Sequence, residues 1–171
     1  MVKIIDVDLF ESKANLLVHQ VNCHNMSNGV ALKISETFPH VEVEYRKYIR
    51  HCKKSKVELL GTVQYVPADD WALIMVDTMK NEKLEAYDKN YQYIVNMFSE
   101  KDFDMENQQT DLKAMKKAMR DICKKAKSIG STVAIPFGIG SSKGGTRWND
   151  VYSLIKEVFD NSGVDVEICK Y

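Results

Sequence analysis

A glycine-rich loop in the last third of the chain is the first feature whose residues could do chemistry. The segment 131–148 reads STVAIPFGIGSSKGGTRW: an apolar run that Pro136 ends, then four glycines within eight residues. Apolar residues at helical spacing follow from Trp148 onward. Glycines let backbone N–H groups approach a ligand closely, and the start of the following helix favours an anion. The loop therefore predicts a site for a phosphate-containing ligand.

Two common phosphate motifs do not fit this loop. The dinucleotide fingerprint G-x-G-x-x-G would require a glycine where the chain has Lys143, and no register supplies the Gly-Lys-Ser/Thr of a P-loop. Because glycine loops are ambiguous, a flexible connection between a strand and a helix, with no ligand, remains an alternative.

A second polar stretch also passes from a strand into a helix. Residues 19–31 read HQVNCHNMSNGVA, with Asn22 at the strand end and Gly29 near the helix start. Ligands of open α/β sheets bind beyond the carboxyl ends of the strands, so this stretch is expected to face the glycine-rich loop. A metal site is disfavoured, because an extended strand would hold His19 and Cys23 about 13 Å apart and no spacing matches structural zinc. We therefore expect no metal and no other cofactor.

The elements that must position these loops alternate along the chain. Apolar patterns predict strands at 2–7, 15–21, 61–66, 71–77, 91–98, 133–135 and 164–169, and helices at 30–38, 39–52, 112–126 and 148–159. Thr110 is expected to cap the third helix. No linker or repeat interrupts the chain, so residues 1–171 are predicted to form a single domain. Strands interleaved with helices predict an α/β fold, a three-layer α/β/α sandwich with a mixed central sheet.

The composition excludes several classes of protein. The 171 residues are 44% hydrophobic and 28% charged, which is typical of a globular domain with its own core. Lys+Arg and Asp+Glu each number 24, and this balance argues against a protein that mainly grips nucleic-acid backbone. No apolar run approaches the roughly 18 residues of a membrane span. The N-terminus lacks a signal-peptide profile, and the four cysteines show no C-x-x-C spacing. We expect a cytoplasmic monomer with reduced thiols and no membrane or nucleic-acid partner.

Several motifs, in their order along the chain, resemble the macro domain, an ADP-ribose-binding module. The resemblance covers nearly the whole sequence. It is greatest to the branch that contains the terminal ADP-ribose glycohydrolase and the yeast ADP-ribose 1''-phosphate phosphatase. The motifs are VDLF at 7–10, LLVHQVNC at 16–23, NGVA at 28–31, FPHVEVEYRKY at 38–48, YIVNMF at 93–98, TDLKAMKKAM at 110–119 and IPFGIGSSKGGTRW at 135–148.

The resemblance implies roles for individual residues. It implies that Asp8 holds the adenine amino group, that the glycine-rich loop cradles a diphosphate, and that Asn22 orients the distal ribose or an attacking water. His19 matches a histidine of the phosphatase branch and is expected to act as acid and base or to hold the phosphate. The predicted catalytic residues are therefore Asn22 and His19. The predicted ligand-binding residues are Asp8, Leu9, Asn22, Gly29, Val30, Pro136, Phe137, Gly138, Ile139, Gly140, Ser141, Ser142, Lys143, Gly144 and Gly145.

Three functions follow as hypotheses. The first is binding of ADP-ribose with hydrolysis at the distal ribose, of a 1''-phosphate or an ester, so the expected partner is ADP-ribose or an ADP-ribosylated substrate. The second is a non-catalytic reader of ADP-ribosylated protein or nucleic acid. The glycohydrolase lysine falls near Ser99 or Glu100, with Lys101 close by, and its aspartate falls near Lys143 or Gly144; this missing pair favours the reader. The third is a structural or partner-binding domain.

Overall fold

A single mixed sheet organises the computed structural model, which describes residues 1–70, 72, 91–101, 109–142 and 144–171. Within these residues the strand order is β1-β6-β5-β2-β4-β3. Neighbouring strands are parallel except for β3, which runs antiparallel to β4 at one edge. The predicted α/β fold with a mixed sheet is confirmed. The strands are β1 (Val2–Ile5), β2 (Leu16–Asn22), β3 (Val63–Pro67), β4 (Tyr93–Glu100), β5 (Val133–Pro136) and β6 (Val166–Cys169).

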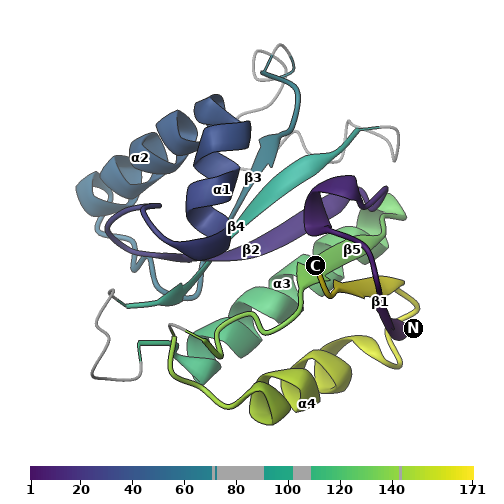
Figure 1. Cartoon of the computed structure of the whole chain (residues 1–171). Helices are drawn as coiled ribbons and strands as arrows, with labels where there is room; N and C mark the ends of the chain where they lie inside the picture. Colours follow the sequence, from purple (N-terminus) through teal and green to yellow (C-terminus); the bar gives the residue numbers. More distant parts are fainter. Residues whose placement is uncertain (71, 73–90, 102–108, 143) are drawn as a thin grey trace.

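Helices cover both faces of the sheet (Figure 1). One face carries α1 (Gly29–Thr37) and α2 (Pro39–Lys54), and the other carries α3 (Leu112–Ile129) and α4 (Trp148–Phe159). Each helix pair buries its own hydrophobic cluster against the sheet, one around Ile34 and Phe98 and the other around Met119 and Phe159. This is the predicted three-layer sandwich. Among the helices described, none is long and apolar enough to cross a membrane.

The N-cap of the helix that precedes the glycine-rich loop lies one residue later than predicted. Asp111, not Thr110, caps α3, because the Asp111 carboxylate accepts a hydrogen bond from the Ala114 N–H at 2.9 Å. Thr110 is instead buried and donates to the Gly140 carbonyl at 3.0 Å. The prediction for Thr110 was therefore wrong, and the reason is that its hydroxyl is used to anchor the glycine-rich loop.

Several predicted boundaries differ from the observed ones by one to three residues. The first strand ends at Ile5 rather than at residue 7, and a 3-10 turn, Leu9–Glu11, follows it. Asp8 caps that turn by accepting from the Phe10 N–H at 2.9 Å. The strand predicted at 71–77 lies outside the described residues, apart from Ala72 in a short turn. All four cysteines are free thiols.

A row of buried polar side chains crosses three strands beneath α2. His19 on β2 pairs with Asn96 on β4, which pairs with Gln64 on β3. His19 Nε2 lies 2.5 Å from Asn96 Oδ1, and Asn96 Nδ2 donates to Gln64 Oε1 at 3.0 Å. Gln64 Nε2 then donates to the Glu44 carbonyl of α2 at 3.0 Å. We call this row the His19–Asn96–Gln64 ladder.

Candidate functional site

A pocket of about 250 Å³ opens beyond the carboxyl ends of the parallel strands, beside the first turn of α1. This is where ligands of open α/β sheets bind. It brings together the two polar stretches that the sequence separates by more than a hundred residues. The described lining residues are Gln20, Asn22, Asn25, Asn28, Gly29, Val30, Glu100, Pro136, Phe137, Gly138, Ile139, Gly140, Ser142 and Gly144.

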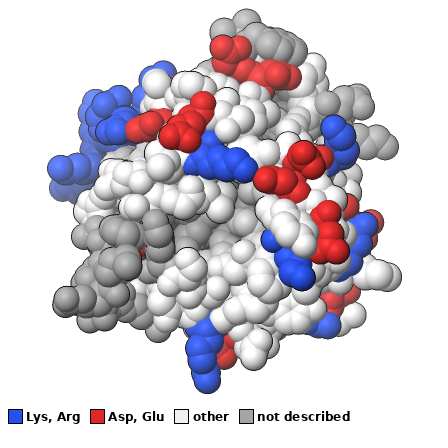
Figure 2. All heavy atoms as spheres, in the orientation of Figure 1, with Lys and Arg blue, Asp and Glu red and all other residues white. Residues whose placement is uncertain are grey.

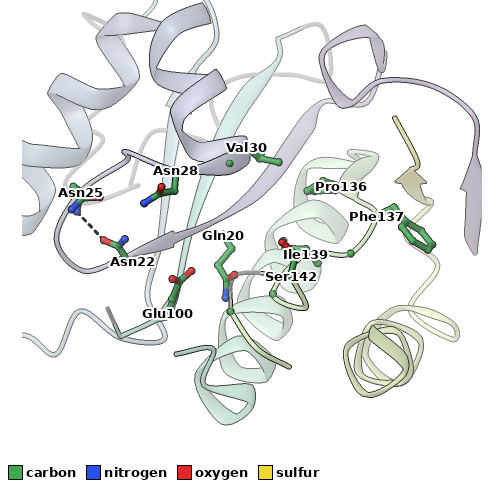
Figure 3. Close-up of a pocket in the computed structure, with 14 residues that line it drawn as sticks. Gln20, Asn22, Asn25, Asn28, Val30, Glu100, Pro136, Phe137, Ile139 and Ser142 are labelled. Carbon is green, nitrogen blue, oxygen red and sulfur yellow. Dashed lines mark hydrogen bonds between the residues drawn. The ribbon is translucent and has the colours of Figure 1, made fainter. Parts of the chain in front are cut away.

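The two ends of the pocket differ in polarity (Figure 3). Val30, Pro136 and Phe137 stand at one end, and the Phe137 ring packs on Trp148 with 4.6 Å between ring centroids. Asn22 and Glu100 stand at the other end. An elongated ligand with one apolar and one polar end would match this arrangement.

The glycine-rich loop supplies hydrogen-bond donors between these ends. Gly138 and Gly140 both have positive φ, 76° and 73°, which turns the chain tightly around the pocket. Within the described part of the chain, the N–H groups of Gly138, Gly140 and Ser142 have no hydrogen-bond acceptor. Such a set of convergent backbone donors is a typical anion-binding concavity.

The first turn of α1 faces the same space. Its N-cap residue, Asn28, makes no side-chain capping bond, and the first turn has no acidic residue. The N–H groups of Gly29 and Val30 are therefore left for a ligand, with the positive end of the helix dipole behind them. Loop and helix together suit a diphosphate held by backbone groups. Figure 2 shows basic and acidic side chains interspersed over the upper and right-hand parts of this face.

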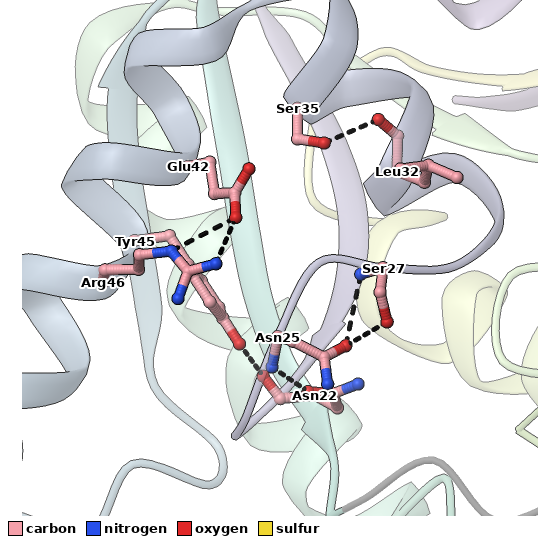
Figure 4. A network of polar contacts seen from close by, with 8 residues as sticks. All are labelled: Asn22, Asn25, Ser27, Leu32, Ser35, Glu42, Tyr45 and Arg46. Atoms are coloured by element: carbon pink, nitrogen blue, oxygen red, sulfur yellow. Dashed lines mark hydrogen bonds and ion pairs between the residues drawn. The ribbon is translucent and has the colours of Figure 1, made fainter.

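The amide of Asn22 is held in one orientation by its own loop. Its Oδ1 accepts from the N–H groups of His24 and Asn25, both at 2.8 Å. Its carbonyl accepts from the Tyr45 hydroxyl at 2.8 Å (Figure 4). Burial raises the pKa of Tyr45, so the phenol stays a donor. Because Oδ1 is engaged, the NH₂ group of Asn22 is the part that can bind a hydroxyl or a water in the pocket.

A bulge brings an acidic side chain next to Asn22. The pairing of β2 with β4 shifts between Val21 and Asn22, so that Asn22 lies opposite Glu100 instead of Ser99. Among the described residues that line the pocket, Glu100 is the only charged one. Its carboxylate enters the polar end from β4, beside the Asn22 amide (Figure 3).

His19 lies in the core rather than in the pocket. Its side chain has no exposed surface, and it does not line the cavity. Burial lowers its pKa to about 4, while the hydrogen bond to Asn96 opposes that shift. Its Nδ1 has no hydrogen-bond partner among the described residues. This placement argues against the direct acid–base role that the sequence suggested.

The remaining predicted residues are Asp8, Leu9, Ser141, Lys143 and Gly145. Asp8 does not line the pocket; it caps the 3-10 turn and pairs with Lys33 at 3.0 Å. The Phe10 N–H and the Lys33 ammonium hold the pKa of the Asp8 carboxyl below its usual value. Leu9 is buried in the core. Ser141 and Gly145 belong to the loop without lining the cavity, and Lys143 lies outside the described residues.

Four lining residues were not predicted. Asn25 and Asn28 lie within the stretch already singled out, so the strand-end argument extended by six residues would have found them. Gln20 donates to Ser99 Oγ and Thr110 Oγ1 at 3.1 and 3.0 Å. The position of Glu100 depends on the bulge in β4, where the pairing with β2 skips Ser99. The alternative residue, Lys101, points elsewhere and approaches Asp111 at 3.8 Å with a side chain 66% exposed.

Comparison with known proteins gives matches at the level of structure. No protein-family model and no curated protein matches the sequence. The macrodomain of Mycobacterium tuberculosis DarG superposes with a TM-score of 0.73 at 22% identity, covering 100% of this chain and 98% of that one. A macrodomain protein from Streptomyces coelicolor gives 0.72 at 19%, covering 100% and 99%. Thermosipho africanus DarTG, solved in complex with ADP-ribose, gives 0.72 at 21%, covering 99% of this chain and 41% of that one.

These matches span the whole chain and agree with the order of motifs in the sequence, although identity is low. The six-stranded mixed sheet between two pairs of helices is shared over its full length. The chain has the macrodomain fold.

Proposed function

We propose that the pocket binds ADP-ribose. The observation that carries this proposal is the set of loop N–H groups, of Gly138, Gly140 and Ser142, that have no acceptor among the described residues and lie between an apolar and a polar end of the pocket. The diphosphate would lie on these donors and on the start of α1. The adenine would pack at the Val30 and Phe137 end, with Asp8 beyond it, and the distal ribose would reach Asn22. The ADP-ribose in the related Thermosipho structure supports the same ligand.

The finer proposal is hydrolysis of a substituent at C1'' of the distal ribose, either a 1''-phosphate or an ester. The Asn22 NH₂ would orient the ribose or the attacking water. Glu100, placed opposite Asn22 by the bulge, would accept a proton from that water. We assign His19 a supporting role through the ladder, because its ring is fully buried and does not line the pocket.

A non-catalytic reader is the second candidate. The observation that favours it is the composition of the lining: among the described residues that line the pocket, Glu100 is the single ionisable side chain. A reader needs only the binding features and a pocket mouth wide enough for an attached macromolecule. The proposal of a cytoplasmic monomer applies equally to both candidates.

Calorimetric titration with ADP-ribose, and with AMP as the smaller control, tests the shared binding step. One-to-one binding of ADP-ribose with much weaker binding of AMP is expected, because AMP has only one phosphate for the loop donors and lacks the distal ribose that would reach Asn22. Ser142→Tyr, which would fill the cavity, should abolish binding, and Ser153→Tyr on the exposed face of α4 should not. Absence of ADP-ribose binding to the unmodified chain would overturn the proposal.

Incubation with ADP-ribose 1''-phosphate and with 1''-ester derivatives then separates hydrolase from reader. Release of free ADP-ribose that depends on Asn22 and Glu100 supports hydrolysis. Tight binding of both derivatives without any release supports the reader and rules out the catalytic role.

A further inference from the structure

Two carboxamide side chains from the end of β2 line the pocket next to one another. Gln20 and Asn22 both belong to its described lining. They are two residues apart on the strand, so their side chains leave the same face of the sheet, about 6.6 Å apart. In Figure 3 the Gln20 amide lies between the Glu100 carboxylate and the glycine-rich loop. Asn22 already has a proposed role at the distal ribose, whereas Gln20 has none.

The orientation of the Gln20 amide follows from its partners. The Thr110 hydroxyl donates its single proton to the Gly140 carbonyl at 3.0 Å, because a carbonyl can only accept. The same Thr110 oxygen therefore accepts from Gln20 Nε2, at 3.0 Å, and Ser99 Oγ accepts from it at 3.1 Å. The NH₂ group of Gln20 is thus bound to the protein. Its carbonyl oxygen, Oε1, has no hydrogen-bond donor among the described residues.

The Asn22 amide is held the opposite way round. Its Oδ1 accepts from the N–H groups of His24 and Asn25, which leaves the NH₂ group for the pocket. The two neighbouring amides therefore present an acceptor, from Gln20, and a donor, from Asn22. A hydroxyl can both donate and accept, whereas a phosphate or carboxylate oxygen without a proton only accepts. Two adjacent hydroxyls, each making a hydrogen bond of about 2.8 Å, fit between side chains at this spacing.

We propose that Gln20 and Asn22 together recognise the 2''- and 3''-hydroxyls of the distal ribose, and that the pocket is selective for ADP-ribose in which both are free. This step rests on the proposed function, which places the distal ribose at Asn22. One hydroxyl donates to Gln20 Oε1, and the other accepts from the Asn22 NH₂. Gln20 is thus a specificity-determining residue and takes no part in proton transfer.

This selectivity narrows the substrates of the site. A substituent at C1'' leaves both neighbouring hydroxyls intact. An acyl group on the 2''- or 3''-oxygen instead replaces a proton that the amide pair requires, and it adds bulk between Gln20 and Asn22. The pocket should therefore accept ADP-ribose that is attached or modified through C1'' and reject its 2''- and 3''-esters, whether the protein is a hydrolase or a reader.

Calorimetric titration of four ligands tests the inference. They are ADP-ribose, its 2''-deoxy and 3''-deoxy analogues, and ADP, which keeps the diphosphate but lacks the distal ribose. Each is titrated into the unmodified chain, into Gln20→Met, which keeps a side chain of similar length without the amide, and into Gln92→Met. The last is the matched control, because Gln92 is a half-buried amide outside the described lining that donates to the carbonyls of Ser12 and Ala14. Thermal melting checks that each variant is folded.

The unmodified chain should bind each deoxy analogue about tenfold more weakly than ADP-ribose, because a missing hydroxyl leaves one of the two amides without its partner. Gln20→Met should weaken ADP-ribose binding about tenfold. It should leave unchanged the binding of ADP and of one deoxy analogue, the one that lacks the hydroxyl bound by Gln20. Gln92→Met should leave the order and the ratios of the four affinities as they are in the unmodified chain.

Three results would overturn the inference, and they are distinguishable. If both deoxy analogues bind the unmodified chain as tightly as ADP-ribose does, the selectivity is absent while the proposed ligand stands. If Gln20→Met weakens all four ligands equally, Gln20 acts only by holding the glycine-rich loop through Thr110. If ADP-ribose does not bind the unmodified chain, the proposed function fails together with the selectivity. Because the first comparison uses the unmodified chain, it does not depend on the folding of a variant.

Discussion

The buried histidine makes stability depend on pH in a predictable direction. Lowering the pH from about 7.5 to about 4.5 would protonate His19 in the unfolded chain, where its pKa is near 6.5, but not in the folded one, where burial lowers the pKa to about 4. The unfolded state therefore binds more protons over this range. The contribution of His19 is fully present above pH 6.5 or so and is lost progressively as the pH falls toward 4.

The size of the effect follows from the two pKa values. With 6.5 in the unfolded chain and about 4 in the folded one, protonation favours unfolding by about 2.5 kcal/mol at pH 4.5. That is a large share of the roughly 5–15 kcal/mol by which a domain is stable. A protonated ring would carry an N–H on both nitrogens. Among the described residues, His19 Nδ1 has no hydrogen-bond partner, so none of them would stabilise that second N–H.

Urea unfolding at the two pH values, followed by circular dichroism, measures this loss. His19→Gln keeps a donor for Asn96 but cannot titrate, so its stability should fall about 2.5 kcal/mol less over the same pH range, whatever its stability at neutral pH. His51→Gln, at an exposed position on α2, serves as the matched control and should behave like the unmodified chain. Parallel losses in all three proteins would refute the view that His19 is buried in its neutral form.

Three further predictions concern the pocket. Asn22→Asp keeps the acceptor for the loop N–H groups but removes the NH₂ donor, so it should melt near the unmodified chain and bind ADP-ribose about tenfold more weakly; unchanged affinity by calorimetry would remove Asn22 from the site. Asp8→Asn should weaken ADP-ribose binding about tenfold if the carboxylate accepts from adenine, and equal affinities would leave Asp8 with its contacts to the Phe10 N–H and to Lys33. Gly144→Ala would place a Cβ against Thr110 Oγ1 and the Gly140 carbonyl, so it should cost about 1–3 kcal/mol of stability by urea unfolding; a neutral result would mean that the loop can move aside.

The sequence predicted the architecture because the relevant signals are local. A short apolar run ended by Pro136, a glycine-rich loop and a helix at regular spacing are all readable within twenty residues. The strand-to-helix passage from Asn22 to Val30 is equally local. Ten of the predicted site residues line the pocket, because both stretches follow strands whose carboxyl ends meet at one edge of the sheet.

What the sequence could not predict depends on pairing between distant segments. β2 reads as a nearly continuous apolar run, as is typical of strands buried on both faces, so nothing local shows that His19 faces α2 and the core. The position of Glu100 depends on the bulge in its own strand, which shows only in the pairing with β2 because that pairing skips Ser99. Thr110 was taken for a helix cap because its partner, Gly140, lies thirty residues away.

The His19–Asn96–Gln64 ladder has a consequence for how the edge of the sheet finds its alignment. β3 is an antiparallel edge strand, and sliding it by one residue along β4 would move each of its side chains to the opposite face of the sheet, which is covered by the other pair of helices. A slide of two residues would not: it would keep Val66 facing the core but bring it opposite Asn96 in place of Gln64. Hydrophobic burial does not distinguish these two alignments, but the ladder does. The misaligned form would leave the Asn96 amide without its acceptor, which would cost about 1–3 kcal/mol of stability. The amides thus select one of two nearly equivalent alignments during folding.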